Sequence, residues 1–293
     1  MKKIDVHIHT SMWEGSFISE GVTFASPEQL RESYAEMGIE KGILLPIVSP
    51  ETHFNVQSSE EMEYLSKKYS DLFYWCCNLD PRMGDNNAKT DFSKILMYYK
   101  ERGAIGVGEL TCNMYTDDPL LENLFYHCGE CDMPVTIHIA PKVNDYYGIV
   151  DELHLPRLEK ILKKYPRLTI VGHSQCFWAE IDGNVTEDVR GKYPEGKVTE
   201  GRITQLMREY PNLWCDLSAG SGYNALTRDT DFAYRFIEEF GDRLMFGTDI
   251  CRPYQKMYLS EWLDKSFEQG YISEKNYAGI SRENAIRLYK LDK

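Results

Sequence analysis

The sequence predicts an α/β fold of one type, a distorted (β/α)8 TIM barrel. About eight short apolar runs alternate with amphipathic stretches, at spacings of roughly 30–45 residues that suit a βα unit. The chain has 293 residues, and one such barrel typically uses about 250. No Gly/Ser linker, low-complexity tract or break in composition divides it. We therefore expect residues 1–293 to form a single domain rather than two.

The expected strands are nearly continuous apolar runs. This pattern is typical of parallel strands that are covered on both faces. In chain order they are residues 4–8, 42–48, 72–77, 104–109, 135–139, 168–173, 213–217 and 243–249.

Helix start signals introduce the amphipathic stretches between these strands. Ser26 and Pro27 are typical of an N-cap followed by a first turn. Ser58 precedes Glu60 and Glu61, whose charges suit the positive end of a helix dipole. Further helices are expected at residues 91–101, 119–131, 155–165, 200–210, 229–240, 258–269 and 281–289.

Three long connections follow a strand and precede a helix: residues 10–26, 140–152 and 174–200. On a barrel, such connections lie at the C-terminal face, where enzymes of this fold keep their active sites. We therefore expect the functional residues at this face.

The composition excludes several classes of protein. The chain carries 33 Lys and Arg against 46 Asp and Glu, a net charge of −13, which argues against nucleic acid and anionic membranes as partners. No apolar stretch approaches the roughly 18–20 residues that span a bilayer. The N-terminus has charged residues where a signal peptide needs an apolar run, so we expect a cytoplasmic protein whose eight cysteines are buried thiols. The 20 Tyr, 12 Phe and 5 Trp are compatible with a homodimer.

Side chains that can bind a metal stand at the ends of five expected strands. Alternate residues of a strand share a face, so the two imidazoles of the first strand point the same way. Each side chain alone has an ordinary structural role, but six of them at strand ends predict a metal site. They are His7, His9, Glu109, His138, His173 and Asp249.

The expected metal follows from these ligand types. Imidazole and carboxylate groups at an open site suit Zn²⁺, with Mn²⁺ and Fe²⁺ as alternatives. Three or four protein ligands with an open position are typical of a catalytic zinc rather than a structural one.

The motifs that carry these residues resemble the amidohydrolase superfamily. The matching phrases are residues 4–9, 136–138, 171–173, 246–249 and 283–288, so the resemblance spans the chain. The run of motifs is similar to the amidohydrolase-related branch that includes aminocarboxymuconate-semialdehyde decarboxylase. The resemblance implies that His7, His9, His138 and Asp249 bind a metal. It implies that His173 is a catalytic acid/base or a ligand of a second metal.

Glu109 departs from part of this pattern. Members with a bridging carbamylated lysine carry it at the end of strand four, where this chain has Glu109. A glutamate there resembles the TatD-like nucleases, in which it helps to hold two metals. The alternative is that Glu109 accepts a hydrogen bond from a ligand histidine, so one or two ions are expected.

The leading hypothesis is a metal-dependent hydrolase of a small organic amide, ester or lactone. A metal lowers the pKa of bound water to about 7, Asp249 serves as general base, and His173 helps to polarise the substrate. The alternative is a single-metal decarboxylase or hydratase of an unsaturated or aromatic carboxylic acid, with His173 as acid/base. A TatD-like phosphoesterase is a third hypothesis.

The loops at this face supply candidate substrate residues. Trp13 and Trp178 could wall a pocket for a planar or apolar substrate, and Arg252 could pair with a substrate carboxylate. Tyr146 and Tyr147 are expected to close over the site as a lid. His53 and a flexible loop at residues 218–222 are expected at the same C-terminal face of the barrel.

Overall fold

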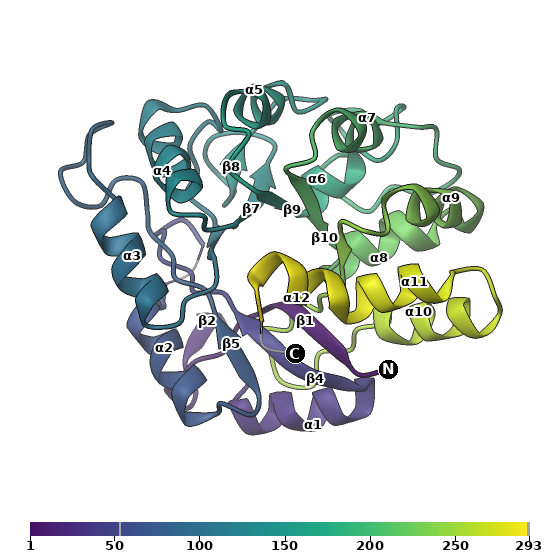
Figure 1. The fold of residues 1–293 in the computed structure, drawn as a ribbon, viewed down its shortest axis with the longest axis horizontal. Coiled ribbons are helices and arrows are strands. Elements are labelled where there is room, and N and C mark those ends of the chain that lie inside the picture. The colour runs from purple at the N-terminus through teal and green to yellow at the C-terminus, as the bar shows by residue number, and fades with distance from the viewer. Residues whose placement is uncertain (53, 292–293) are drawn as a thin grey trace.

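The computed structural model describes residues 1–52 and 54–291 and has an α/β fold. Two parallel sheets are ordered β1-β4-β5 and β11-β10-β9-β7-β6, and helices surround them (Figure 1). Each of the eight expected strands overlaps one strand of these sheets, within the described residues. They are β1 (Lys3–Ile8), β4 (Ile39–Leu44), β5 (Phe73–Trp75), β6 (Val107–Leu110), β7 (Val135–Ala140), β9 (Ile170–His173), β10 (Leu213–Asp216) and β11 (Leu244–Met245).

Backbone hydrogen bonds connect the two sheets at both edges. Beside β1, the N–H of Val6 donates to the carbonyl of Phe246 at 3.0 Å, and Ile8 pairs in parallel with Ile250. Just beyond β5, Cys77 pairs in parallel with Val107 of β6. The segments that extend the outer strands therefore continue the parallel pairing from one sheet to the other.

The nine expected helices form within one to three residues of their predicted ends, over the part of the chain that the structure describes. Ser26 and Ser58 act as N-caps, and their side chains accept hydrogen bonds from the N–H groups of Gln29 and Glu61. The helices are α1 (Pro27–Met37), α2 (Ser59–Lys68), α3 (Ser93–Glu101), α4 (Pro119–Glu130), α5 (Pro156–Lys164), α7 (Arg202–Glu209), α9 (Thr230–Phe240), α10 (Leu259–Glu268) and α12 (Asn284–Tyr289).

Several short elements were not predicted. A hairpin of β2 (Phe17–Ser19) and β3 (Val22–Thr23) lies in the first long connection, and β8 (Ile149–Val150) pairs with β7. The others are α6 (Gln175–Ala179), α8 (Ala219–Thr227), α11 (Glu274–Ala278) and the π-helix η1 (Gly279–Glu283).

The prediction of a flexible loop at residues 218–222 was wrong, because α8 begins there. A Cβ atom at Gly222 would lie 2.2 Å from the carbonyl oxygen of Leu217. Glycine therefore lets the helix turn tightly against the end of β10, which composition alone did not reveal.

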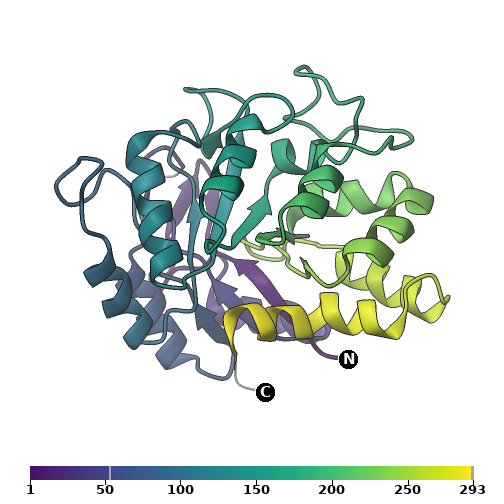
Figure 2. The same ribbon diagram turned by 45° about the horizontal axis from the view of Figure 1, so that its top comes forward.

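The core has two parts. Apolar side chains between the strands and the outer helices form the larger cluster. A smaller one packs Tyr289 and Ala285 of α12 against Val6, Val171 and Met245 of the strands, and Figure 2 shows α12 lying across one end of them. This packing closes the end of the strands that carries no candidate ligand.

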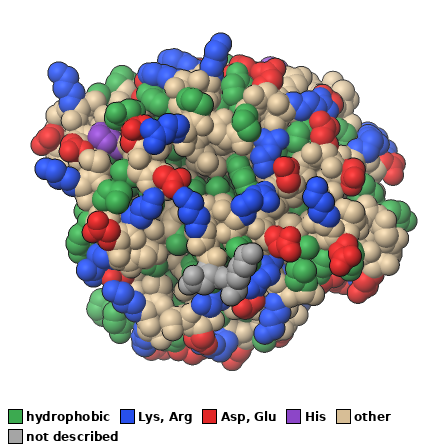
Figure 3. Space-filling model, viewed as in Figure 1, with side chains coloured by type: hydrophobic (Ala, Val, Ile, Leu, Met, Phe, Trp, Pro, Cys, Tyr) green, Lys and Arg blue, Asp and Glu red, His purple; other side chains and the backbone are tan. Residues whose placement is uncertain are grey.

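The surface and the cysteines agree with the composition. Acidic and basic side chains are interspersed over the face in Figure 3. All eight cysteines are free thiols, and seven of them are buried. Among the described residues, no helix is long and apolar enough to cross a membrane.

Candidate metal centre

The structure brings all six predicted ligands together. His7 lies in β1 and His9 just after it, Glu109 in β6, His138 in β7 and His173 at the end of β9. Asp249 follows β11, and its side chain is 28% exposed, whereas the other five residues are buried. The centre therefore opens to solvent on the side of Asp249.

One group of ligands consists of His7, His9 and Asp249. The Nε2 atoms of the two imidazoles lie 3.0 Å apart. Oδ1 of Asp249 lies 3.6 Å from Nε2 of His7 and 3.4 Å from Nε2 of His9. Three ligand atoms thus surround one point.

The contacts of the Nδ1 atoms fix the orientation of the His7 and His9 imidazoles. Nδ1 of His9 lies 2.8 Å from the carbonyl oxygen of Leu45, which can only accept, so this nitrogen carries the proton. Nδ1 of His7 lies 2.6 Å from Oδ2 of Asp216. Both Nε2 atoms can therefore present lone pairs to the same space, and this donor set fits a divalent cation.

The second group consists of Glu109, His138 and His173. Oε1 of Glu109 lies 2.7 Å from Nδ1 of His138 and 3.8 Å from Nε2 of His173. Oε2 of the same carboxylate lies 3.5 Å from Nε2 of His7 and 3.6 Å from Nε2 of His9. Glu109 therefore stands between the two groups, with one oxygen toward each.

Electrostatics also favour a cation here. Burial lowers the pKa of His7, but three carboxylates raise that pKa well above its usual value; they belong to Glu109, Asp249 and Asp216. Burial raises the pKa of Glu109, but the charges of His7 and His138 hold it well below its usual range. A site that holds a proton this strongly also attracts a metal ion, which competes for the same lone pairs.

Asp216 is a functional residue that the sequence prediction missed. Its carboxylate is fully buried, and Oδ2 faces Nδ1 of both His7 and His173, at 2.6 and 3.2 Å. Ser218 donates to Oδ2 through its hydroxyl and lies 3.0 Å from Nδ1 of His173. The signal was present, because Asp216 ends β10 just as His173 ends β9.

Asp5 holds the backbone next to the candidate ligands His7 and Asp249. It accepts hydrogen bonds from the N–H groups of His7 and Thr248 and from the hydroxyls of Thr248 and Tyr34. Burial outweighs these bonds and raises the pKa of Asp5 to about 7. These contacts hold β1 against the segment that leads to Asp249.

The expected substrate residues are placed differently from one another. Trp178 is 2% exposed, and its indole N–H donates to the carbonyl of Asp216 at 2.9 Å, because α6 turns it into the core. Trp178 therefore packs in the core against the backbone of Asp216, which corrects the prediction that it walls a pocket. Arg252 is exposed. His53 lies outside the described residues.

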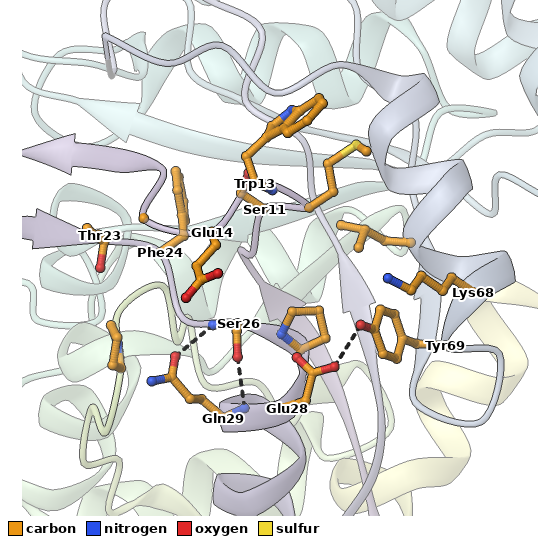
Figure 4. Close-up of a pocket in the computed structure, with 15 residues that line it drawn as sticks. Ser11, Trp13, Glu14, Thr23, Phe24, Ser26, Glu28, Gln29, Lys68 and Tyr69 are labelled. Atoms are coloured by element: carbon orange, nitrogen blue, oxygen red, sulfur yellow. Dashed lines mark hydrogen bonds between the residues drawn. The ribbon is translucent and has the colours of Figure 1, made fainter.

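Trp13 lines a pocket of about 570 Å³ between the first long connection, the start of α1 and the end of α2 (Figure 4). Its side chain is 66% exposed. Lys68 and Glu28 line the same pocket, and none of the six ligands is among its lining residues in the described chain. The structure therefore places Trp13 at a pocket that these ligands do not line.

Tyr147 lies directly against the ligands. Its ring centroid is 4.5 Å from that of His138, with the ring planes tilted by 46°. Burial raises the pKa of Tyr147, and the negative charges of Glu109 and Asp249 raise it further. Tyr146, the next residue, instead places its ring under Nζ of Lys142 at 5.6 Å.

Comparison with known proteins bears on the family and the fold of the chain. A family model described as amidohydrolase matches residues 84–291. None of the curated protein sequences matches the chain.

Solved structures share the fold. A 2,6-dihydroxybenzoate decarboxylase from Rhizobium is 16% identical, with a TM-score of 0.61 and all of both chains covered. A dihydroxybenzoic acid decarboxylase from Polaromonas sp. JS666, with bound manganese and 2-nitroresorcinol, is 17% identical, with a TM-score of 0.62 and 100% and 98% covered. A probable 2-pyrone-4,6-dicarboxylic acid hydrolase from Acinetobacter baumannii, with bound citric acid, is 14% identical, with a TM-score of 0.59 and 99% and 100% covered. At these identities the likeness concerns the fold.

Proposed function

The chain belongs to the amidohydrolase family, and from this premise we propose that it is a metal-dependent hydrolase of a small organic amide, ester or lactone. One observation carries the proposal. The two oxygens of Glu109 face two separate groups of imidazoles, Oε2 toward His7 and His9 and Oε1 toward His138 and His173. A carboxylate in this position can bridge two metal ions, and such pairs are typical of hydrolytic metal centres.

The ligand types favour zinc in both positions. Imidazole nitrogens and carboxylate oxygens are its usual ligands, and Mn²⁺ and Fe²⁺ accept the same set. His7, His9 and Asp249 would hold one ion, and His138 and His173 the other, with Glu109 between them.

The proposal extends to the fold that holds the ligands. The backbone bonds beside Val6 and Ile8 and the pairing of Cys77 with Val107 join the two sheets at both edges. They support a closed, distorted (β/α)8 barrel with the centre at the C-terminal ends of its strands, where barrel enzymes keep their active sites.

In the proposed hydrolysis, the residues of the centre have different roles. A divalent metal held by these residues would supply Lewis acidity and would lower the pKa of bound water to about 7. Asp249, the most exposed of the six, accepts the proton of the attacking water and returns it to the leaving group. Asp216 and Ser218 hold Nδ1 of His173, which leaves Nε2 of His173, 3.9 Å from Oδ2 of Asp249, as the nitrogen that would bind the second ion.

A decarboxylase remains the second candidate. The similar folds include the decarboxylases from Rhizobium and Polaromonas, the second with bound manganese. In this reading one metal is held by His7, His9, His138 and Asp249, and His173 protonates the carbon that loses the carboxylate. Glu109 would then only orient His138 through its 2.7 Å contact.

Metal stoichiometry separates the two candidates. Protein purified without chelator is analysed for metal in the wild type, in Glu109→Gln and in a control, Glu130→Gln, whose side chain pairs with Arg167 on the surface. We expect about two ions per chain in the wild type and the control, and about one in Glu109→Gln. One ion in all three proteins would reject the binuclear hydrolase and favour the decarboxylase.

A further inference from the structure

Tyr147 lies between the candidate centre and a surface pocket. One part of its ring contacts the His138 imidazole at a centroid distance of 4.5 Å, yet the side chain remains 39% exposed. The same residue lines a pocket of about 390 Å³ with Glu51, Asn113 and residues 143–146. The Tyr147 side chain therefore faces both this pocket and the candidate ligand His138.

The backbone beside Tyr147 is fixed against the centre. Gly148 has φ +108°, and a Cβ atom there would lie 2.7 Å from the carbonyl oxygen of His138 and 2.8 Å from its Cδ2. Its N–H donates to the carbonyl of Thr111 at 2.7 Å, and the amide of Asn113 donates to its carbonyl at 3.2 Å. Glycine thus allows the loop to return onto His138, and two hydrogen bonds keep it there.

The hydroxyl of Tyr147 is a free donor. Within residues 1–52 and 54–291, no side chain or backbone group pairs with it. By contrast, the hydroxyls of Tyr34, Tyr69 and Tyr99 each donate to a carboxylate. An unpaired phenol next to a metal ligand is placed to donate to something that binds there.

On the basis of the proposed function, we propose that Tyr147 is a substrate-binding residue. Its ring forms the wall of the substrate site beside His138, and its hydroxyl donates a hydrogen bond to an oxygen atom of the substrate. The substrate class that this geometry fits is a planar molecule carrying carbonyl, carboxylate or phenolic oxygens. The ring accommodates the planar part, and the hydroxyl and the metal centre recognise the oxygens.

The test uses 2-nitroresorcinol as probe, because it is planar, carries several oxygens and is the inhibitor bound in the Polaromonas structure. Its dissociation constant is measured by absorbance with metal-loaded wild type, Tyr147→Phe and Tyr146→Phe. Tyr146 is a matched control, since it lines the same pocket but places its ring at Lys142. Metal content is measured for each protein.

We expect the dissociation constant to rise about tenfold in Tyr147→Phe, as for the loss of one hydrogen bond, and to change less than about twofold in Tyr146→Phe. Metal content should be equal in all three. Unchanged affinity in Tyr147→Phe, or a metal-loaded wild type that does not bind the probe, would overturn the proposal. Loss of metal in Tyr147→Phe would also overturn the proposal, because Tyr147 would then have a structural role in the metal centre. A wild type without metal would reject the proposed function itself.

Discussion

At the scale of single residues, Asp216 couples two parts of the centre. Its Oδ2 atom faces Nδ1 of His7 and Nδ1 of His173, two of the candidate metal ligands. Since both imidazoles contact the same carboxylate, a substitution of Asp216 should alter the orientation of both rings. The carboxylate therefore acts through the histidines as a positioning residue.

Substitution Asp216→Asn should lower metal affinity by about 10–100-fold, the usual effect of losing a carboxylate behind a ligand histidine. The affinity is measured by competition with a chromophoric chelator. Asp242→Asn is the control, because the carboxylate of Asp242 is exposed and its ion pair with Arg243 is long, at 3.9 Å. Equal affinity in Asp216→Asn and the control would show that His7 keeps its orientation without the carboxylate.

The sequence predicted the ligands better than their surroundings. His7, His138 and Asp249 could be found because a polar side chain at the end of an apolar strand is conspicuous. Asp216 stands in the same kind of place, but its role depends on which neighbours it meets across the sheet. Trp178 shows the reverse case, since a loop position after His173 does not reveal that α6 turns the side chain inward.

At the scale of elements, α1 is tied to β1 and β4 through one close contact. The hydroxyl of Tyr34 in α1 donates to Oδ2 of Asp5 in β1 at 2.9 Å. It fits there because Gly42 of β4 has no side chain, and a Cβ atom at Gly42 would lie 2.0 Å from that hydroxyl. Asp5 also accepts from the N–H of His7, so this contact lies directly behind the centre.

Gly42→Ala should therefore lower the free energy of unfolding by about 1–3 kcal/mol, as overpacking of a core does. Urea unfolding measures the change. The loss should be smaller when Gly42→Ala is made in a Tyr34→Phe background, because that variant lacks the colliding hydroxyl. Gly191→Ala serves as control, since nothing lies within 4 Å of its added Cβ. Equal losses in both backgrounds would reject the steric explanation.

Element prediction succeeded where local signals suffice. The N-caps Ser26 and Ser58 marked α1 and α2, and the apolar runs marked the strands. The hairpin β2–β3 and the helices α6 and α11 were missed because each of these strands and helices has only two to five residues. Elements this short are stabilised by tertiary contacts rather than by their own sequence.

At the scale of the whole molecule, the centre links the two sheets. His7 and His9 come from the sheet β1-β4-β5, whereas Glu109, His138 and His173 come from the other sheet. Eight of the strands were readable from the repeated βα pattern. Their registers were not, because the bulges of β1 and β6 depend on pairing between distant segments.

A metal ion held by both sheets should stabilise the entire fold. A ligand that binds only the folded state at 100 times its dissociation constant adds about 2.7 kcal/mol, and a chain of this size gains about 2–4 °C per kcal/mol. Wild-type protein treated with chelator should therefore melt about 5 °C or more below the same protein reloaded with zinc or manganese, as measured by calorimetry. In His7→Ala the difference should largely disappear, because that variant loses the imidazole whose Nε2 atom lies 3.5 Å from Oε2 of Glu109 and 3.6 Å from Oδ1 of Asp249. A wild type that melts at one temperature in both states would mean that the six side chains do not hold a metal across the two sheets.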